Sequence, residues 1–317
     1  MTTVINQAGA LYNDSTQSYS LNRFKRVIFG YGENASFSNV STTNLVSITG
    51  VTSTDVTGVG TARCLISAAS YGYDRAIFAY GFITTTTAIS NLVSNLGVVA
   101  TDTAGVGTAR YIPGAAGYGL DKAIFAYGES SGLGRYNFVT LVSNIGVNTT
   151  NAQAVGTSRA YMGAATYGLD KAIFGYGDSG RTTTRYSMTN LVSNVGVISA
   201  DVAGVGTARS RLAAASYGGD KVIFGYGSTG DADATVLSIK NLVSNLGVVA
   251  ADVAGVGTAR SRLAAASYGG DKAIFGYGKT TVKVSITNLV SNIGVVTADV
   301  TGVGTARSDL AAASFGP

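Results

Sequence analysis

The stretch RSRLAAASYGGDKAIFGYG (260–278), followed by ITNLVSNIGVV (286–296) and GVGTAR (302–307), recurs through the chain as six near-copies of one unit. The arginine that closes each copy returns after 47, 49, 50, 51 and 47 residues. These closing arginines are Arg63, Arg110, Arg159, Arg209, Arg260 and Arg307. A nearly fixed period of this length indicates an array of one supersecondary unit, in which no unit buries its apolar face alone.

Within one unit, the local patterns are all typical of β-strands. LAAASYG (212–218) is short and rich in small residues, which suits a crowded and fully buried strand. DKAIFGYG (271–278) follows a Gly-Gly turn, and VSITNLVSN (284–292) carries β-branched residues. The Asn-Ile-Gly step at 292–294 then turns the chain into a fourth strand. Four antiparallel strands per unit, with no helical period, predict an all-β fold built from propeller blades.

The two ends of the chain predict how the array closes. The last copy stops at ARSDLAAASFGP (306–317), after the first strand of a unit, and the first copy starts at LNRFKRVIFGYG (21–32), with the second strand. We therefore expect the C-terminal strand to complete the first blade, which hides both free sheet edges. The six copies predict a closed six-bladed β-propeller with four-stranded blades over residues 21–317, preceded by an extended arm over residues 1–20.

The composition restricts the chemistry that this chain can perform. It has 317 residues, no histidine, no tryptophan and one cysteine, Cys64. The missing histidines remove the commonest general base and the commonest metal ligand, and one cysteine cannot form an internal disulfide or a thiolate zinc cluster. The compartment's redox state cannot be read from a single cysteine. We expect no metal and no cofactor.

Charge and hydropathy bear on the partners. The net charge of +5 is spread over the chain without a block of Lys or Arg, so nucleic acid is not an expected partner. No apolar run approaches the roughly 18 residues of a membrane helix, so membrane insertion is not expected. The start of the chain has no basic segment followed by an apolar one, so no secretory signal peptide is expected.

An enzyme is not expected either. A copper oxidase site on such a ring needs histidine ligands. Glutamate is scarce, and Glu33 and Glu129 both fall in variable segments, so paired carboxylates for glycoside hydrolysis would have to come from isolated positions.

RLAAASYGGDKAIFGYG (262–278) carries a resemblance to a known repeat. The order of arginine, small-residue strand, Gly-Gly, and basic-aromatic strand ending in glycine resembles the kelch repeat, and it covers nearly the whole chain. Two features depart from that pattern: Gly-Tyr-Gly replaces the Gly-Gly after the second strand, and the fourth-strand tryptophan is absent. The resemblance implies a propeller fold and no particular activity.

The combination of DKAIFGYG, TNLVSN and GVGTAR looks more specifically like the kelch-like structural proteins of marine tailed bacteriophages, including cyanophages. This resemblance implies a non-catalytic virion protein on the capsid, neck or tail, as a decoration or an appendage that contacts the host surface. It further implies protein–protein interaction with other virion proteins, with self-association and a host-surface glycan as further candidate interactions. The alternative function is a carbohydrate-binding, lectin-like adhesion propeller.

Residues that repeat in all six units are interpreted as structural. Each closing arginine has an Asp eight residues upstream, or Asn151 in the third unit, and we expect it to pair with that Asp or with carbonyls at an inter-blade corner. The Asp-Lys pairs are expected at turns. The tyrosines of Gly-Tyr-Gly are expected to pack between blades in place of the missing tryptophan. The alternative for the arginine ring is an axial anion site.

Asymmetry between the units is concentrated between the second and third strands. These variable segments are 33–40, 82–87, 129–137, 178–185, 228–234 and 279–283. They are expected as loops on one side of the disc, where binding is normally grafted onto a rigid scaffold. The candidate contact residues are Phe37, Phe82, Tyr136 and Arg181, and neutral variation of solvent loops is the alternative.

The arm lies outside the repeat and mixes Val4, Ile5, Leu11 and Tyr12 with polar residues. It cannot bury enough apolar surface to fold alone, so it is expected to be extended or disordered in isolation. In an assembly it would attach the disc to a neighbour by adding its backbone to a sheet edge or lying in a groove. A disordered leader without function is the alternative.

Overall fold

The computed structural model describes residues 4–5, 11–12, 25–132, 134–180, 184–230 and 233–316. Over these residues the chain forms short strands grouped into small antiparallel sheets, which confirms the predicted all-β class. No helix within the described residues is long and apolar enough to cross a membrane.

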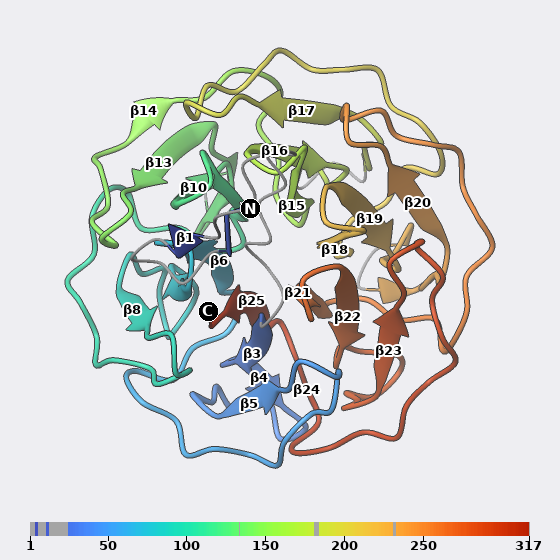
Figure 1. The fold of residues 1–317 in the computed structure, drawn as a ribbon, viewed down its shortest axis with the longest axis horizontal. Coiled ribbons are helices and arrows are strands. Elements are labelled where there is room, and N and C mark those ends of the chain that lie inside the picture. Colours follow the sequence, from blue (N-terminus) through green and yellow to red (C-terminus); the bar gives the residue numbers. More distant parts are fainter. Residues whose placement is uncertain are drawn as a thin grey trace.

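Six principal sheets surround one central axis (Figure 1). Each has an inner strand beside the axis, a middle strand and an outer strand. In this order, sheet by sheet, the strands are β25 (Ala311–Phe315), β3 (Arg26–Gly30) and β5 (Thr43–Val46); β6 (Ser67–Tyr71), β7 (Arg75–Ala79) and β8 (Ser90–Val93); β9 (Gly114–Tyr118), β10 (Lys122–Ala126) and β13 (Phe138–Val142); β15 (Gly163–Tyr167), β16 (Lys171–Gly175) and β17 (Thr189–Val192); β18 (Ala213–Tyr217), β19 (Lys221–Gly225) and β20 (Lys240–Val243); and β21 (Ala264–Tyr268), β22 (Lys272–Gly276) and β23 (Thr287–Val290).

Residue size explains which strand takes which place. The inner strands consist largely of Ala, Ser and Gly, because six strands that converge on one axis leave no room for larger side chains. The middle strands are buried on both faces: Ala273, Ile274 and Phe275 of β22 are all fully buried. Their large side chains fill the space between adjacent sheets, so that Phe275 packs in one cluster with Ile223 of the neighbouring sheet. The apolar core is therefore a series of contacts between sheets.

The strand pairing passes through the two ends of the chain. β25 pairs with β3 from Ala311↔Gly30 to Phe315↔Arg26, as the sequence predicted. β21 and β22 pair in the same way, from Ala264↔Gly276 to Tyr268↔Lys272. The inner strands contact one another in the circular order β25, β6, β9, β15, β18, β21 and back to β25.

Hydrogen bonds at the turns also run through the ends of the chain. The amide of Gly72 donates to the carbonyl of Asp121 over 2.7 Å, and Gly316 donates to Asp74 over the same distance. Gly269 donates over 2.9 Å to Lys25, which takes the place that an Asp has in the other units. The first sheet, built from both ends of the chain, is thus joined to its neighbours as the others are.

The predicted fourth strand is wrong for five of the six sheets. Only the third sheet has one, β14 (Ala152–Gln153), which pairs with β13. In the first sheet the outermost segment makes isolated bridges such as Thr43↔Val56. The side chain of Asn44 explains this, because its amide donates to the Ser53 carbonyl over 3.1 Å, where a backbone ladder would otherwise continue. The third sheet has Thr140 at the equivalent position.

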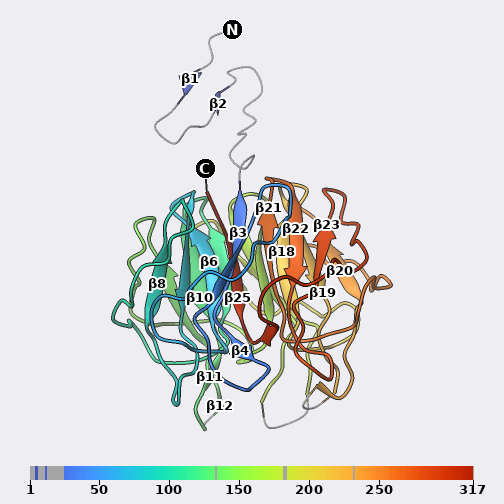
Figure 2. The same ribbon diagram turned by 90° about the horizontal axis from the view of Figure 1, so that it is seen from below.

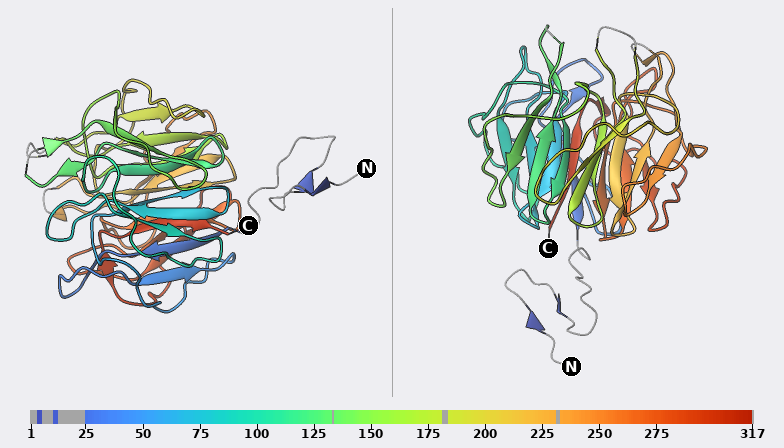
Figure 3. Two further views of the ribbon diagram at one scale, coloured as in Figure 1. Left: turned by 90° about the vertical axis from the view of Figure 1, so that its left-hand side faces the viewer. Right: turned by 90° about the horizontal axis from the view of Figure 1, so that it is seen from above.

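The two ends of the axis differ, as Figures 2 and 3 show. The turn end holds the tight turns between inner and middle strands, together with the start of β3 and the C-terminal end of β25. The loop end holds the variable segments, including β4 (Glu33–Asn34), β11 (Glu129–Ser130) and β12 (Gly134–Arg135). β24 (Arg307–Ser308) pairs with β4 there.

In the arm, β1 (Val4–Ile5) pairs with β2 (Leu11–Tyr12) in antiparallel register. The other residues predicted to belong to the arm lie outside the described residues.

Candidate functional site: the loop end of the ring

The six closing arginines connect neighbouring sheets and are fully buried. Arg63 precedes β6 and donates through Nε to the carbonyl of Tyr80 over 2.9 Å and through Nη2 to Oδ1 of Asn91 over 2.7 Å. Its guanidinium lies over the ring of Tyr31 from the preceding sheet, 4.4 Å from the centroid. Burial lowers the pKa of Arg63, although the nearby Tyr31 and Asp102 act in the opposite direction.

The tyrosines under these arginines also pack across the sheet boundary. The ring of Tyr31 meets that of Phe78 edge to face with 5.1 Å between centroids, and Tyr277 meets Phe29 at 5.2 Å across the first and last sheets. The tyrosines therefore lie between sheets, where the sequence placed them. Each buried boundary contains an arginine, a tyrosine and a phenylalanine from adjacent sheets.

The Asp that faces a closing arginine, or Asn151 in the case of Arg110, is not the one eight residues upstream of it, which corrects that prediction. It belongs to the following unit: Nη1 of Arg159 lies 3.7 Å from Asp201, and Nη1 of Arg307 lies 3.8 Å from Asp55. The carboxylate mainly holds the threonine before the arginine, since Thr305 donates to Asp55 through its amide and its hydroxyl. Burial acts to raise the pKa of Asp55, but these hydrogen bonds and that of Asn44 outweigh it, so the pKa lies below its ordinary value.

With six buried guanidinium groups engaged by these partners, the arginine ring lies at the sheet boundaries and not on the axis. The closing arginines therefore do not form the axial anion site that the sequence left open as an alternative.

Most of the variable segments are joined to the next one in a belt at the loop end. Asn39 donates to the Phe82 carbonyl over 3.2 Å, joining the first two segments. Arg135 forms ion pairs with Glu129 of its own segment and with Asp178 of the next. Similar contacts join other neighbouring segments: Arg185 to the Gly230 carbonyl, Asp233 to Lys279, and Lys283 to Glu33. These segments therefore brace one another across sheet boundaries.

The four candidate contact residues do not form one site. Phe37 is 75% exposed, and Nζ of Lys283 lies 4.2 Å from its ring centroid. Phe82 is half-buried against Tyr111, and Tyr136 is half-buried and stacked on Phe138. Arg181 lies outside the described residues. Each described candidate thus packs against a different neighbour.

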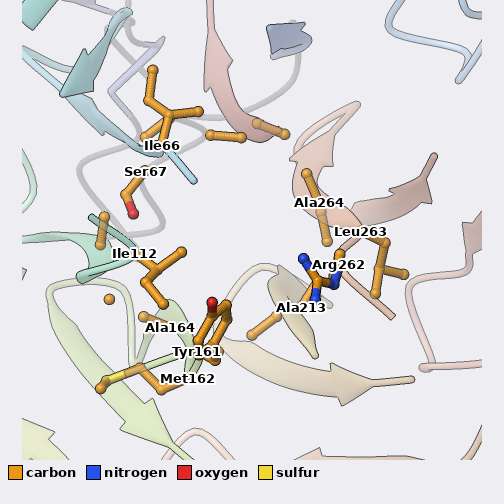
Figure 4. A pocket seen from close by; sticks show the side chains of 18 of the residues that line it. Ile66, Ser67, Ile112, Tyr161, Met162, Ala164, Ala213, Arg262, Leu263 and Ala264 are labelled. Atoms are coloured by element: carbon orange, nitrogen blue, oxygen red, sulfur yellow. The ribbon is translucent and has the colours of Figure 1, made fainter. Parts of the chain in front are cut away.

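The residue two positions after each closing arginine forms a ring at the axial mouth of the loop end. Going round the axis, these six residues are Leu65, Ile112, Tyr161, Arg211, Arg262 and Asp309. They line a cavity of about 130 Å³ together with the first residues of the inner strands (Figure 4). Backbone hydrogen bonds link them in series, for example from the amide of Arg262 to the carbonyl of Arg211 over 2.9 Å.

One half of this mouth is apolar and the other half is charged. Asp233 of the fifth variable segment is buried beside the charged half, where it accepts from Nε of Arg262 over 2.6 Å and from Ser261 over 2.8 Å. Arg262 also donates to Asp309 over 3.1 Å. Burial acts to raise the pKa of Asp233, but the charges of Arg262 and Arg211 outweigh it and hold the pKa below its ordinary value.

Sequence reasoning missed this mouth because it searched for asymmetry only between the second and third strands. A signal was present in the repeat itself. The position two after the closing arginine changes from aliphatic to aromatic to cationic to anionic, while the inner strand that follows stays small and uniform. Asp233 carried no such signal, because nothing in the sequence places a loop residue beside the axis.

The turn end carries a different surface, a rim of exposed apolar side chains. They come from the Ser-Asn-Leu-Gly-Val type turns after the outer strands, two from each unit. The rim consists of Ile48, Val51, Leu96, Val98, Ile145, Val147, Val195, Val197, Leu246, Val248, Ile293 and Val295. These turns border the chain ends, since Arg26 donates to the Asn95 carbonyl over 3.0 Å.

Within the described residues, no group of three or more His, Cys, Asp and Glu side chains is placed to hold a metal ion. No protein-family model matches the chain, and no curated protein matches it significantly.

Proposed function

We propose that the chain is a closed six-bladed β-propeller with kelch-like repeats, in which each principal sheet is one blade. The circular order of the inner strands and the pairing of β25 with β3 support this reading. Each blade then has three regular strands and a fourth edge held by isolated bridges, except for the blade that contains β14.

We further propose that this propeller is a non-catalytic structural and interaction component of a tailed-phage virion, on the capsid, neck or tail. The apolar rim of the turn end is the observation that carries this proposal. Exposed apolar side chains gathered at one end of a protein offer surface for association. The rim repeats in every blade and surrounds the end at which β3 begins, so it suits docking onto a large protein assembly.

The buried arginines support the same class of function. They and their Tyr, Asn and Asp partners repeat around the ring as a rigid frame. In this proposal the turn end and residues 1–20 face other virion proteins, or a second copy of the chain, and the loop end faces outward toward the host surface. The virion is proposed as the location because DKAIFGYG, TNLVSN and GVGTAR resemble segments of phage structural proteins.

The test is incorporation into particles. Tagged chain is supplied during infection by a phage that encodes it, and gradient-purified particles are assayed for the tag. The proposal expects the intact chain in the particles, and expects loss after deletion of residues 1–20 or after the paired change Leu246→Asp with Ile293→Asp at the rim. Val282→Asp, a similarly exposed position in a loop-end segment, is the matched control. Absence of the intact chain from the particles rules the proposal out.

The alternative is a carbohydrate-binding adhesion propeller, favoured by the braced belt of variable segments with Tyr136 stacked on Phe138. A glycan array probed with the purified ring separates the two functions. Specific sugar binding that is lost in Tyr136→Ala, together with absence from particles, supports the adhesion function alone.

A further inference from the structure

We propose that the axial mouth of the loop end binds a small organic monocarboxylate with an apolar body, and that Arg211 receives the carboxylate. This site is distinct from the rim on which the proposed function rests, so either proposal can fail alone.

The six mouth residues share one unusual backbone conformation, as do the six tyrosines of the Gly-Tyr-Gly segments. All six mouth residues have φ between 46° and 56°, in the left-handed region that favours glycine. The chain uses 43 glycines, yet none occupies these positions. Side chains are therefore kept at the mouth against a backbone preference that glycine would relieve.

The charged half leaves one arginine incompletely paired. The guanidinium of Arg262 is paired with two carboxylates, since its Nε lies 2.6 Å from Oδ2 of Asp233 and its Nη1 lies 3.1 Å from Oδ2 of Asp309. Arg211 reaches Asp233 only at 3.5 Å, and among the residues that the structure describes its buried Nε and Nη1 have no hydrogen-bond partner. Buried donors of a charged group are expensive to leave unpaired, so a ligand acceptor at this place would be strongly favoured.

The charge count favours an anion. Within the described residues, the ion pairs of this cluster join three cationic side chains, Arg211, Arg262 and Lys279, to two carboxylates, Asp233 and Asp309, so one cation of the cluster has no carboxylate of its own. A carboxylate supplies the missing charge, and its two oxygens match the planar donors of a guanidinium.

The opposite half defines the body of the ligand. Leu65, Ile112 and Tyr161 occupy three consecutive positions of the mouth, and Met162 lines the cavity behind Tyr161 (Figure 4). Arg211 lies over the ring of Tyr161, 4.7 Å from its centroid, which fixes the guanidinium at the boundary between the two halves. A hydroxyl-rich sugar would leave its hydroxyls unpaired against these aliphatic groups.

The volume limits the size. The cavity holds about 130 Å³, close to the roughly 150 Å³ of an engineered protein cavity that accepts benzene. One six-membered ring or a branched chain of similar size therefore fits, with its carboxylate at Arg211.

Benzoate is the probe, and benzamide is its neutral counterpart of the same shape. Calorimetric titration of the full chain is expected to give saturable benzoate binding with a Kd of about 1 mM, typical for a ligand of this size, and at least tenfold weaker binding of benzamide. Arg211→Leu should weaken benzoate binding at least tenfold, whereas Arg75→Leu at the turn end should leave it unchanged.

A second variant covers the case in which Arg211→Leu disturbs the buried Asp233. Ile112→Trp fills the apolar half at the position next to Leu65, away from Asp309, and should abolish binding of benzoate. Thermal unfolding of each variant reports whether the ring is intact. The proposal is overturned if the intact chain shows no saturable benzoate binding up to 20-fold the expected Kd, if benzamide binds equally well, or if both variants bind like the original chain.

Discussion

The guanidinium of Arg63 lies 4.4 Å from the ring centroid of Tyr31, although the two residues belong to adjacent sheets. The same arginine donates to the carbonyl of Tyr80 in its own sheet. A cation over an aromatic face is stabilising when both are shielded from water. One side chain thus joins two sheets, and five more arginines take the equivalent place around the ring.

Loss of one such arginine should destabilise the whole ring. Arg159→Met removes the donors to the Tyr176 carbonyl and to Asn190 and leaves both acceptors buried. We expect the free energy of unfolding to fall by about 3 kcal/mol, measured by urea denaturation. Arg159→Lys should not restore it, because an ammonium cannot reproduce the planar stacking and forked donors. Arg75→Met, at a half-exposed arginine, is the control, and an equal loss there would contradict the assigned role.

The pairing of β25 with β3 predicts that the position at which the chain is opened can be moved. A permuted chain that joins Gly316 through one glycine to Lys25 and opens between residues 132 and 134 should fold with the same far-ultraviolet circular dichroism and at least the same thermal midpoint. Deleting residues 308–317 should instead abolish cooperative unfolding, because β3 and its neighbours lose their inner partner. A cooperative transition at an unchanged temperature in the deletion variant would contradict this account of the first sheet.

A gap in a ring of hydroxyl bonds predicts a stabilising change. Ser216 donates to the Thr166 carbonyl over 2.6 Å, and Thr166 donates to the Gly117 carbonyl over 2.8 Å. Gly117 has no hydroxyl to donate onward to Ser70. Gly117→Ser should therefore raise the free energy of unfolding by about 1 kcal/mol relative to Gly117→Ala, the control with a β-carbon and no hydroxyl.

The space for a side chain at position 117 is limited by Thr166. A β-carbon at Gly117 lies 3.2 Å from Oγ1 of Thr166, so the hydroxyl of Thr166 must move slightly. Equal stability of the Ser and Ala variants in urea denaturation would show that the new hydroxyl does not reach the Ser70 carbonyl.

The buried tyrosines predict sensitivity to alkali. Burial raises the pKa of Tyr31, Tyr127 and Tyr277 from 10 to about 12, against the opposing effect of the neighbouring arginines. The unfolded chain therefore loses these protons first, and stability present below pH 10 is lost as the pH rises toward 12. The urea midpoint should fall between pH 10 and 12, with tyrosinate absorbance appearing together with unfolding. Tyr277→Phe should reduce the fall of the urea midpoint with pH. An unchanged fall would show that Tyr277 does not contribute to the sensitivity to alkali.

Much of the architecture could be predicted because it depends on local patterns that repeat. The small-residue run of β18, the basic-aromatic run of β22 and the Asn-Ile-Gly turn each identify their element without reference to other units. The absence of a regular fourth strand from five sheets could not be predicted, because the sequence of that segment suits a strand. The side chain of Asn44 from the preceding strand takes the hydrogen-bonding place that a ladder would use.

The candidate site was likewise predictable only in part from the sequence. Exposed aromatics in variable segments were predicted as contacts, but Phe82 and Tyr136 pack on neighbouring rings once the segments meet. The pairing of Arg307 with Asp55, at opposite ends of the chain, depends on which units become neighbours. No spacing rule along the sequence contains that information.

The sequence by itself determined the number of units, the order of strands within each unit, and the sharing of the first sheet between the two chain ends, because period and alternation are properties of the chain. Only the tertiary structure decided that the closing arginines face Asp or, for Arg110, Asn side chains of the following unit. It also decided that Arg211, Arg262 and Asp309 meet Leu65, Ile112 and Tyr161 around one cavity. The reason is that these contacts join residues at equal places in different units, and the distance between such residues is set by the curvature of the ring.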